Sequence, residues 1–370
     1  MTAFAARSMG YDVHVLDPDS SAPARAVATR FIEAQFDDAD AIVRLAEGCA
    51  VLMPEIETIS ADGMARAIAH APVRPGGDVL GVIQDRGRQK QWLATQGFPL
   101  TPFQLIRNDA DCERAAASLT GRCYVKAVTG GYDGRGQVRT DTPAGVRSAW
   151  DLLGRREVVA EQGVEIAMEL SVMVARTPSG AIASYPPAAN HHVDGILAWS
   201  VIPGVADHGL ATRARELAES IADALRVEGL LCAEMFLSAS GALIVNELAP
   251  RPHNSYHESV EGCATSQFEQ AVRAICDLPL GDTRSLRPAA IANLLGELWP
   301  AESAPDFTGL LATPMTRLHL YGKRNPRPGR KMGHIAATAE TPALAVQRVV
   351  AARNALADDA GATEWTVGGT

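Results

Sequence analysis

The sequence predicts a protein of mixed α/β and α+β class with more than one domain. Its 370 residues exceed what a single hydrophobic core of ordinary size holds. Strand and helix patterns alternate over residues 1–80, as in a Rossmann-like layer, and an antiparallel hairpin follows near residue 235. We therefore expect a Rossmann-like domain over 1–84, a central domain over 85–286 and a small C-terminal domain over 287–370.

The composition is that of a globular protein. Hydrophobic residues make up 47% and charged residues 21% of the chain, and no apolar run approaches the roughly 18–20 residues of a membrane span. A net charge of −9 opposes a large surface for phosphate backbones, so we expect neither membrane nor nucleic acid as a partner. The six cysteines are scattered without a CxxC pair and no signal peptide is evident, which predicts reduced thiols and a cytoplasmic location.

The N-terminal elements form an unusual start. We expect a helix at Thr2–Met9, a strand at Asp12–Asp17, a helix at Asp37–Glu47, a short strand at Ala50–Pro54 and a helix at Ser60–His70 capped by its serine. A doubly wound domain normally opens with a strand whose glycine-rich exit turn binds phosphate. Here a helix comes first, so either the fold starts unusually or the start codon has been set too far downstream.

Two lysines and a glycine-rich loop follow in the central region. Lys90 lies on a predicted helix at Asp85–Gln96, and Lys126 lies on a predicted strand at Arg122–Ala127. The next loop carries four glycines, at Gly130, Gly131, Gly134 and Gly136. Such a loop presents amide groups that can wrap phosphates, although a glycine-rich hairpin without a ligand has the same pattern.

Two acidic residues and a histidine pair come next. The strand at 157–161 delivers Glu161, and the strand at Met168–Ala175 carries Glu169. Residues 190–192 then form an expected polar loop that contains His192. Since no cysteine or second histidine pair lies nearby, solvent or substrate contact is favoured there over metal binding.

A hairpin is the feature around which the rest of the chain is organised. Its strands are Leu231–Leu237 and Ala242–Asn246, joined by a small-residue turn. In the expected register Glu234 pairs with Val245, and Glu247 is the diagonal neighbour of Glu234 on the same face.

Both faces of this hairpin are apolar, so two uncompensated carboxylates there would cost several kcal/mol, roughly. A magnesium ion held by Glu234 and Glu247, with Asn246 and substrate phosphates as further ligands, is the simplest remedy. The alternative is that both acids point to solvent at a strand end.

Basic residues gather in two places after the hairpin. Arg251 lies between two prolines in a loop suited to rigid binding. Near the C-terminus, the loop Gly322–Met332 carries five positive charges, at Lys323, Arg324, Arg327, Arg330 and Lys331. It is either a solvated turn or a pocket for the phosphate of a small substrate.

This order of features resembles the ATP-grasp superfamily, whose members hold ATP between two α+β subdomains and make an acyl phosphate. Several segments closely resemble the family of 5-(carboxyamino)imidazole ribonucleotide synthases: GGYDGRGQ at 130–137, NELAPRPHNS at 246–255, TSQFEQ at 265–270, NLLGE at 293–297, and YGK with RPGRKMGH within 321–334. The resemblance spans essentially the whole chain. It implies an ATP-grasp fold with a lid subdomain at about residues 120–170.

The resemblance also implies a site for ATP and magnesium. Its nucleotide contacts would be Lys90, Lys126, Gly130, Gly131, Gly134, Arg135, Gly136, Glu161, Val164, Glu169, His192, Asn246 and Glu247. Among these, Glu161 and Val164 would contact adenine and Glu169 the ribose. Glu234 and Glu247 would hold the magnesium ion, in agreement with the hairpin argument.

The remaining implied contacts concern bicarbonate and the aminoimidazole ribonucleotide. The groups around the reacting atoms would be Tyr132, Asp133, Arg251, His253 and Asn254. The ribonucleotide would be bound through its phosphate by Lys323, Arg330 and Lys331, and through its base by Glu55 or Glu57.

The implied reaction is ATP-dependent carboxylation of 5-aminoimidazole ribonucleotide by bicarbonate through carboxyphosphate, a step of purine biosynthesis. The resemblance also implies that the protein is a homodimer. Two alternatives stay open: another ATP-grasp ligase acting on a different amine, and a nucleotide-binding protein without turnover. The second follows because Met1 stands where the family's glycine-rich opening turn would end. Tyr256 stands where the family usually has glycine, and a side chain of this size beside the bicarbonate loop is large enough to narrow it.

Overall fold

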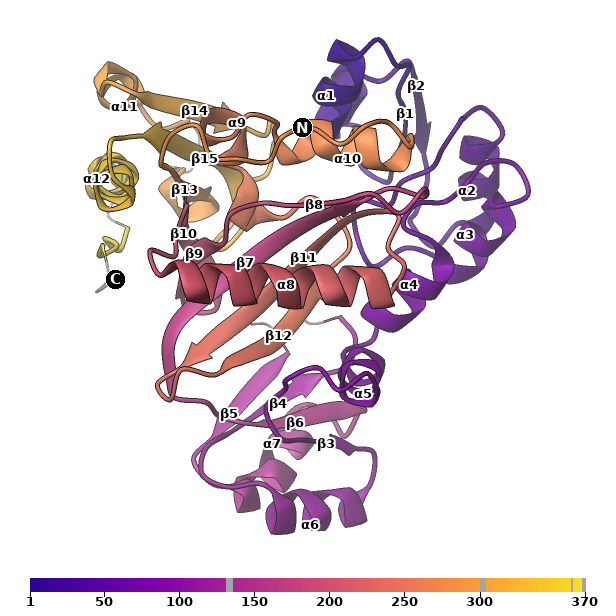
Figure 1. Ribbon diagram of the computed structural model, residues 1–370, viewed down its shortest axis with the longest axis vertical. Helices are drawn as coiled ribbons and strands as arrows, with labels where there is room; N and C mark the ends of the chain where they lie inside the picture. Colours follow the sequence, from indigo (N-terminus) through magenta and orange to yellow (C-terminus); the bar gives the residue numbers. More distant parts are fainter. Residues whose placement is uncertain (131–135, 300–303, 361, 368–370) are drawn as a thin grey trace.

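The computed structural model describes residues 1–130, 136–299, 304–360 and 362–367. These residues form an N-terminal layer, a four-stranded sheet at the opposite end of the molecule and a nine-stranded sheet between them (Figure 1). Within the described ranges, no helix is both long and apolar enough to cross a membrane.

The N-terminal layer follows most of the expected alternation. Its elements are α1 (Thr2–Ser8), β1 (His14–Asp17), β2 (Arg30–Glu33), α2 (Ala39–Ala46), α3 (Ala61–Ala67) and α4 (Gly77–Ile83). β1 and β2 pair in parallel, and the Ser60 hydroxyl caps α3 by accepting from the Gly63 amide, as predicted. The prediction of a strand at Ala50–Pro54 is wrong, because this segment forms only a single bridge between Leu52 and Val73.

The four-stranded sheet has the order β3-β6-β4-β5 and is antiparallel throughout. Its elements are β3 (Phe103–Ile106), α6 (Asp109–Ser118), β4 (Cys123–Ala127), β5 (Gln137–Thr140), α7 (Val146–Leu152) and β6 (Val158–Gln162). The buried Trp150 packs with α6 and β4 residues in a core of its own. We propose that this layer, which includes β3 and α6 in addition to the expected range, is the lid.

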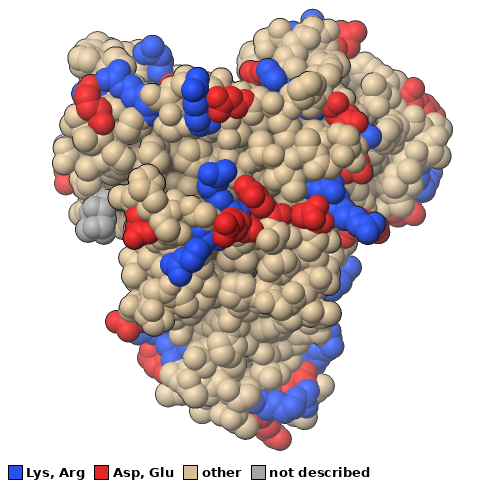
Figure 2. Space-filling view, viewed as in Figure 1, with Lys and Arg blue, Asp and Glu red and all other residues tan. Residues whose placement is uncertain are grey.

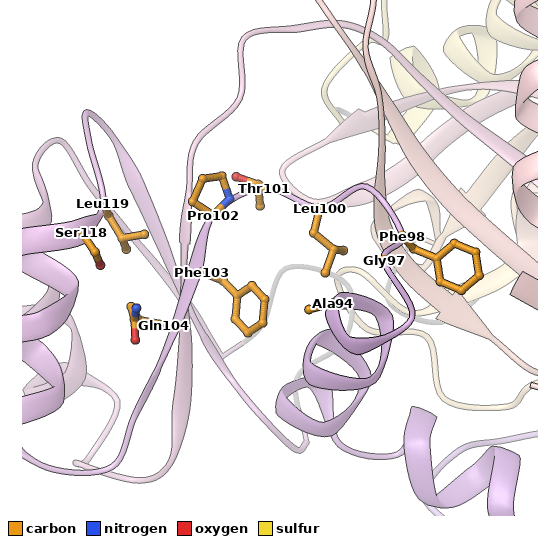
Figure 3. A pocket seen from close by; sticks show the side chains of 10 residues that line it. All are labelled: Ala94, Gly97, Phe98, Leu100, Thr101, Pro102, Phe103, Gln104, Ser118 and Leu119. Atoms are coloured by element: carbon orange, nitrogen blue, oxygen red, sulfur yellow. The ribbon is translucent and has the colours of Figure 1, made fainter. Parts of the chain in front are cut away.

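The segment at residues 97–102 connects the lid to the rest of the protein. It follows α5 (Arg86–Thr95), and the Val245 amide donates to the carbonyl oxygen of Pro99, 2.8 Å away. Beside this segment lies an open hollow of about 430 Å³ lined by Ala94, Gly97, Phe98, Leu100, Thr101, Pro102, Phe103, Gln104, Ser118 and Leu119 (Figure 3). These lining residues are mostly apolar, and none of them belongs to the expected nucleotide site.

The nine-stranded sheet forms the body of the molecule. Its first strands are β7 (Ile166–Arg176), β8 (Ile182–Ser184), β9 (Ala188–Val193), β10 (Ile196–Ile202), β11 (Gly229–Ser238) and β12 (Leu243–Ala249). The apolar side of α8 (His208–Ala224) covers one face of these strands, and α10 (Gln267–Ile275) packs in the core on the other. The outer side of α8 carries charges of both signs along a band (Figure 2), so it is a solvated helix surface.

The sheet continues into the C-terminal region. The additional strands are β13 (Ala289–Leu295), β15 (Lys331–Thr338) and β14 (Thr316–Leu320), and β13 pairs with β10. α12 (Pro342–Ala360) covers β13 and β15, and its Val349 shares a core with Trp199 of β10. The expected basic loop is shorter than predicted, because β15 begins at Lys331.

The hairpin forms as expected, but in a different register. Glu234 pairs directly with Glu247, and Met235 pairs with Val245. Asn246 is therefore the extra residue of a β-bulge in β12. The predicted pairing of Glu234 with Val245 is wrong because it assumed continuous alternation. Val245 accordingly packs on the α8 face instead of beside the acids.

Candidate active site

The acid pair lies between two cationic side chains. Glu234 Oε1 is 3.0 Å from His253 Nε2, and Arg86 Nη1 donates to Glu247 Oε2 at 3.1 Å. Burial raises the pKa of Glu234, but His253 and His192 outweigh it and hold that pKa at about 2. Each carboxylate is thus paired with a cationic side chain of the protein, while 43% of the Glu247 side chain is exposed.

Arg86 is the site residue that the sequence analysis missed. It opens α5 directly after the N-cap Asp85 and lies four residues before Lys90, so both cations share one helix face. Burial lowers the pKa of Arg86, whereas Glu247, Glu161 and Glu234 raise it to a net value above normal. The spacing of four residues was the signal that could have identified it.

The two predicted lysines meet at Glu161. Lys126 Nζ donates to Glu161 Oε2 at 3.1 Å, and Lys90 Nζ lies 3.4 Å from the same oxygen. Only 1% of the Lys90 side chain and 4% of the Glu161 side chain are exposed. Burial would raise the pKa of Glu161, but Lys126, Lys90 and Arg86 lower it to about 2. Burial lowers the pKa of Lys90 despite Glu161.

Glu169 and His192 form a pair at the middle of the sheet. They lie on the adjacent strands β7 and β9, and His192 Nδ1 hydrogen-bonds to Glu169 Oε2. Burial lowers the pKa of His192, but this bond and the Glu169 charge raise it overall. The polar loop expected at 190–192 is wrong: these residues belong to β9, which is paired on both sides by β7 and β10.

The loop after β12 reaches the N-terminal layer. Arg251 Nε donates to Glu57 Oε1 at 2.8 Å, whereas Glu55 is exposed. Burial lowers the pKa of Arg251, but Glu57 and Glu55 raise it above normal. Asn254 presents a buried side-chain amide whose oxygen and nitrogen have no hydrogen-bond partner within the described part of the chain. The loop therefore places a held cation and two unused polar atoms near the acid pair.

The NLLGE segment holds the basic loop in place. The Gly296 amide donates to the carbonyl oxygen of Arg330 at 2.9 Å, and the Gly329 amide donates to Glu297 Oε2 at 3.0 Å. A Cβ atom on Gly296 would lie 2.2 Å from the carbonyl oxygen of Arg327. Only glycine therefore permits this close approach of the two backbones.

The cations of the basic loop act on charged groups of both the central sheet and the N-terminal layer. Lys323 Nζ donates to the backbone oxygen of Lys331 at 2.9 Å, and Arg330 Nη1 donates to that of Asn325 at 2.8 Å. The Lys331 charge contributes to the low pKa of Glu234. In the N-terminal layer, hydrogen bonds from Ser21 lower the pKa of Asp19, with smaller contributions from Arg330 and Arg324.

Tyr256 does not narrow the loop after β12. Its side chain is fully buried in the core beneath the sheet and packs edge-on against Tyr185, with ring centroids 5.7 Å apart. Its hydroxyl lies within hydrogen-bond distance of the backbone oxygens of Ser171 and Pro186. Because this side chain turns inward, it takes no space in the loop.

The expected phosphate loop is described only at its ends. Gly130 and Gly136 have φ values of +73° and +72°, which favour glycine. The predicted residues Gly131, Tyr132, Asp133, Gly134 and Arg135 lie outside the described residues. Val164 lies in the short connection between β6 and β7.

The donor set at the bulge suits an oxygen-binding cation. The bulge residue Asn246 has a buried Oδ1 without a hydrogen-bond partner in the ranges that the structure describes, next to the directly paired Glu234 and Glu247. Those same ranges contain no cluster of three or more histidine, cysteine, aspartate and glutamate side chains suited to a metal. A bound ion would thus need oxygens from a ligand to complete its shell.

Comparisons with known proteins agree with this architecture. Residues 1–84 match the ribonucleotide synthetase preATP-grasp domain, 91–268 the ATP-grasp domain, and 289–348 the phosphoribosylaminoimidazole carboxylase C-terminal domain. The N5-carboxyaminoimidazole ribonucleotide synthase of Bacillus subtilis is 38% identical over 336 residues, which are 90% of this chain and 87% of that protein.

Solved structures show the same relationship. An N5-carboxyaminoimidazole ribonucleotide synthetase in complex with ADP has a TM-score of 0.89 at 36% identity, covering 97% of this chain and 94% of its own. The Aspergillus clavatus enzyme in complex with ADP and 5-aminoimidazole ribonucleotide has a TM-score of 0.88 at 28% identity, covering 97% and 95%. The expected ATP-grasp fold, with its preATP-grasp and small C-terminal domains, is confirmed. The chain belongs to the N5-carboxyaminoimidazole ribonucleotide synthase family of ATP-grasp ligases.

Proposed function

We propose that the chain carboxylates 5-aminoimidazole ribonucleotide with bicarbonate and ATP, through carboxyphosphate, to give N5-carboxyaminoimidazole ribonucleotide, ADP and phosphate in purine biosynthesis. The observation that carries the proposal is the directly paired Glu234 and Glu247 with Arg86 beside them. The charge of Arg86 also acts on Glu161, which binds Lys90 and Lys126. Paired acids beside clustered cations suit a magnesium-bound polyphosphate.

ATP would lie between the lid and the nine-stranded sheet. Arg86, Lys90 and Lys126 would bind its phosphates, and Glu169 would accept hydrogen bonds from the ribose. Glu161 holds both lysines together, which supports a preorganised phosphate site. Three fixed cations would stabilise the charge that develops on the transferring phosphoryl group.

Magnesium would be held by Glu234, Glu247 and the unpaired Oδ1 of Asn246. When bound, it supplies positive charge to the β- and γ-phosphates. Glu247 would exchange its contact with Arg86 for the metal, and Arg86 would then face the phosphates. The ion pair of 3.1 Å with Arg86 keeps the Glu247 carboxylate at this proposed site.

Bicarbonate and the ribonucleotide would meet at the loop after β12. Arg251, held by Glu57, would bind the carboxylate, and His253 and Asn254 would donate or accept hydrogen bonds around the reacting atoms. Tyr132 and Asp133 are proposed to act here also. Lys323, Arg330 and Lys331 would bind the ribonucleotide phosphate, since the NLLGE segment keeps their loop against the C-terminal strands.

The compartment and the assembly are proposed on separate grounds. All six cysteines are free thiols, and four of them are buried, as is usual for a protein of the reducing cytoplasm. A homodimer is proposed from the family resemblance alone.

One assay tests the proposed function. Phosphate release is measured with ATP and magnesium, with bicarbonate and 5-aminoimidazole ribonucleotide added singly and together. We expect full release only when both are present, and formation of one carboxylated product per phosphate. Nucleotide binding without release would instead support a protein without turnover, and release with a different amine would support another ATP-grasp ligase.

A further inference from the structure

A chain of buried polar side chains crosses the central sheet. Glu258 contacts Ser200 of β10 at 3.1 Å, Ser200 contacts Asn190 of β9 at 2.9 Å, and Asn190 contacts Ser171 of β7 at 3.1 Å. The Ser171 hydroxyl lies 2.8 Å from that of Ser255. We call these five side chains the buried chain. All except Asn190 have no exposed surface, so these hydrogen bonds cannot be replaced by solvent without cost.

The buried chain ends at the acid pair. Ser255 Oγ lies 2.8 Å from Nδ1 of His253, and Nε2 of the same ring lies 3.0 Å from Glu234 Oε1. Both nitrogens of the imidazole are therefore held, one by the chain and one by a proposed metal ligand. Groups that hold the far nitrogen of a histidine commonly set the orientation of its ring.

The surroundings of Glu258 disfavour its charged form, because its side chain is fully buried. Its Oε2 is buried and has no hydrogen-bond partner among the residues described, which a charged carboxylate would make costly. Burial raises the pKa of Glu258 well above its usual range, against the lowering by hydrogen bonds from its backbone and Ser200. In its neutral form Glu258 can donate to Ser200 Oγ, whereas in its charged form it only accepts from Ser200.

Donation from Glu258 to Ser200 would set the direction of the hydrogen bonds further along the buried chain. Ser200 has one hydroxyl proton, and once it accepts from Glu258 it is free to donate to Asn190 Oδ1. The amide oxygen of Asn190 is then fixed, so its nitrogen donates to Ser171 and Ser171 donates to Ser255. Ser200 Oγ also lies 3.1 Å from the backbone oxygen of Ser255, the alternative acceptor. An ionised or absent Glu258 would let Ser200 turn away from Asn190.

We propose that Glu258 is a positioning residue for carboxylation, which through the buried chain sets the orientation of the His253 ring against Glu234. Its side chain is fully buried, so it acts through the other members of the buried chain. The inference rests on the proposed function for its kinetic test, whereas its structural test is independent of activity.

The first test compares two substitutions at one position. Glu258→Gln keeps a donor toward Ser200, whereas Glu258→Leu removes it with a similar volume. We expect Glu258→Gln to retain kcat within about 2-fold, and Glu258→Leu to lower kcat by about 10- to 100-fold without changing the KM for ATP. Tyr256→Phe is the matched control, since it removes a buried hydroxyl from the same segment but lies outside the buried chain. It should keep kcat unchanged.

The second test separates a connected chain from independent structural effects. Ser171 and Glu258 do not touch, yet Ser171→Ala and Glu258→Leu interrupt the same chain. We expect the double variant to be no slower than the worse single variant, whereas independent effects would multiply. Multiplying losses, a Glu258→Leu enzyme with normal kcat, or a Glu258→Gln enzyme as slow as Glu258→Leu would each overturn the inference.

Two further measurements keep the result interpretable. If Glu258→Leu does not fold, Ser200→Ala replaces it, with the same expected loss of kcat. A crystal structure of the variant without ligands should show the His253 ring rotated away from Glu234, and an unmoved ring would refute the inference. If the unmodified protein lacks the proposed activity, the proposed function fails while this structural comparison still decides the role of Glu258.

Discussion

Replacing Glu161 by glutamine should destabilise the lid side of the nucleotide site at neutral pH. Glu161 lies between the Nζ atoms of Lys126 and Lys90, at 3.1 and 3.4 Å, and Glu161→Gln removes the charge while keeping the shape. Lys90, of whose side chain only 1% is exposed, would then lack its anionic partner. A buried cation that loses its partner carries most of the cost.

The magnitude follows from the pKa of the carboxyl. The pKa of Glu161 falls from 4.5 to about 2 in the folded protein, as Lys126, Lys90 and Arg86 outweigh the effect of burial. At about 1.36 kcal/mol per pKa unit, this corresponds to about 3 kcal/mol of stability at pH 7. Because the folded pKa is the lower one, the contribution is complete above pH 4.5 and is lost as the pH falls toward 2. At pH 3 linkage leaves less than half of it.

The assay is urea unfolding of both proteins at pH 7 and pH 3 without nucleotide. We expect a difference of about 3 kcal/mol that shrinks by more than half at pH 3. Glu157→Gln is the control, because Glu157 lies just before β6, is more exposed and pairs with Arg107. Loss of its charge should change the free energy of unfolding by less than about 0.5 kcal/mol. Adding Lys90→Met to Glu161→Gln should recover part of the loss. Equal differences at both pH values, or a Glu161→Gln protein as stable as the original, would refute this account of the cluster.

Three further predictions concern the proposed activity and the core. Glu247→Gln should lower phosphate release by at least about 100-fold, roughly the loss of one electrostatic contact to the transition state. Its control is Glu216→Gln on the exposed side of α8. Unchanged release at any magnesium concentration would disprove the metal assignment. Gly296→Ala, whose added Cβ would lie 2.2 Å from the Arg327 carbonyl oxygen, should raise the KM for the ribonucleotide while leaving the KM for ATP unchanged; equal changes in both constants would argue against a ribonucleotide site at this loop. Tyr256→Ala should lower the free energy of unfolding by about 3 kcal/mol through the cavity it leaves, as measured by urea unfolding, and a stability within 0.5 kcal/mol of the original would contradict the buried position of its ring.

Local patterns were sufficient for most elements and for many site residues. The Ser60 cap, the helix that carries Lys90 and the strand that carries Lys126 all follow from signals within a few residues. Even the metal ligands could be proposed from one hairpin, because a turn and two acids lie close together in the chain. The spacing of four residues between Arg86 and Lys90 also indicates that both cations lie on one face of α5.

Other features depended on contacts between distant segments. The bulge at Asn246, which makes Glu234 and Glu247 direct partners, leaves no mark on the pattern of apolar residues. Residues 190–192 resemble a polar loop, yet neighbours on both sides make them a strand. The sequence places Tyr256 in the loop after β12, but only the fold shows that its ring packs in the core.

The sequence by itself determined the fold class, the order of domains and the residue types of the proposed magnesium-nucleotide site, since these are encoded in periodicity, caps and motifs along the chain. Only the tertiary structure decided that β10 and β13 join the central and C-terminal strands into one sheet. It also decided that hydrogen bonds through four other side chains connect Glu258 to His253. The physical reason is that strand pairing and buried hydrogen bonds are chosen by which edges and polar atoms meet after folding, and no local stretch of sequence contains both partners.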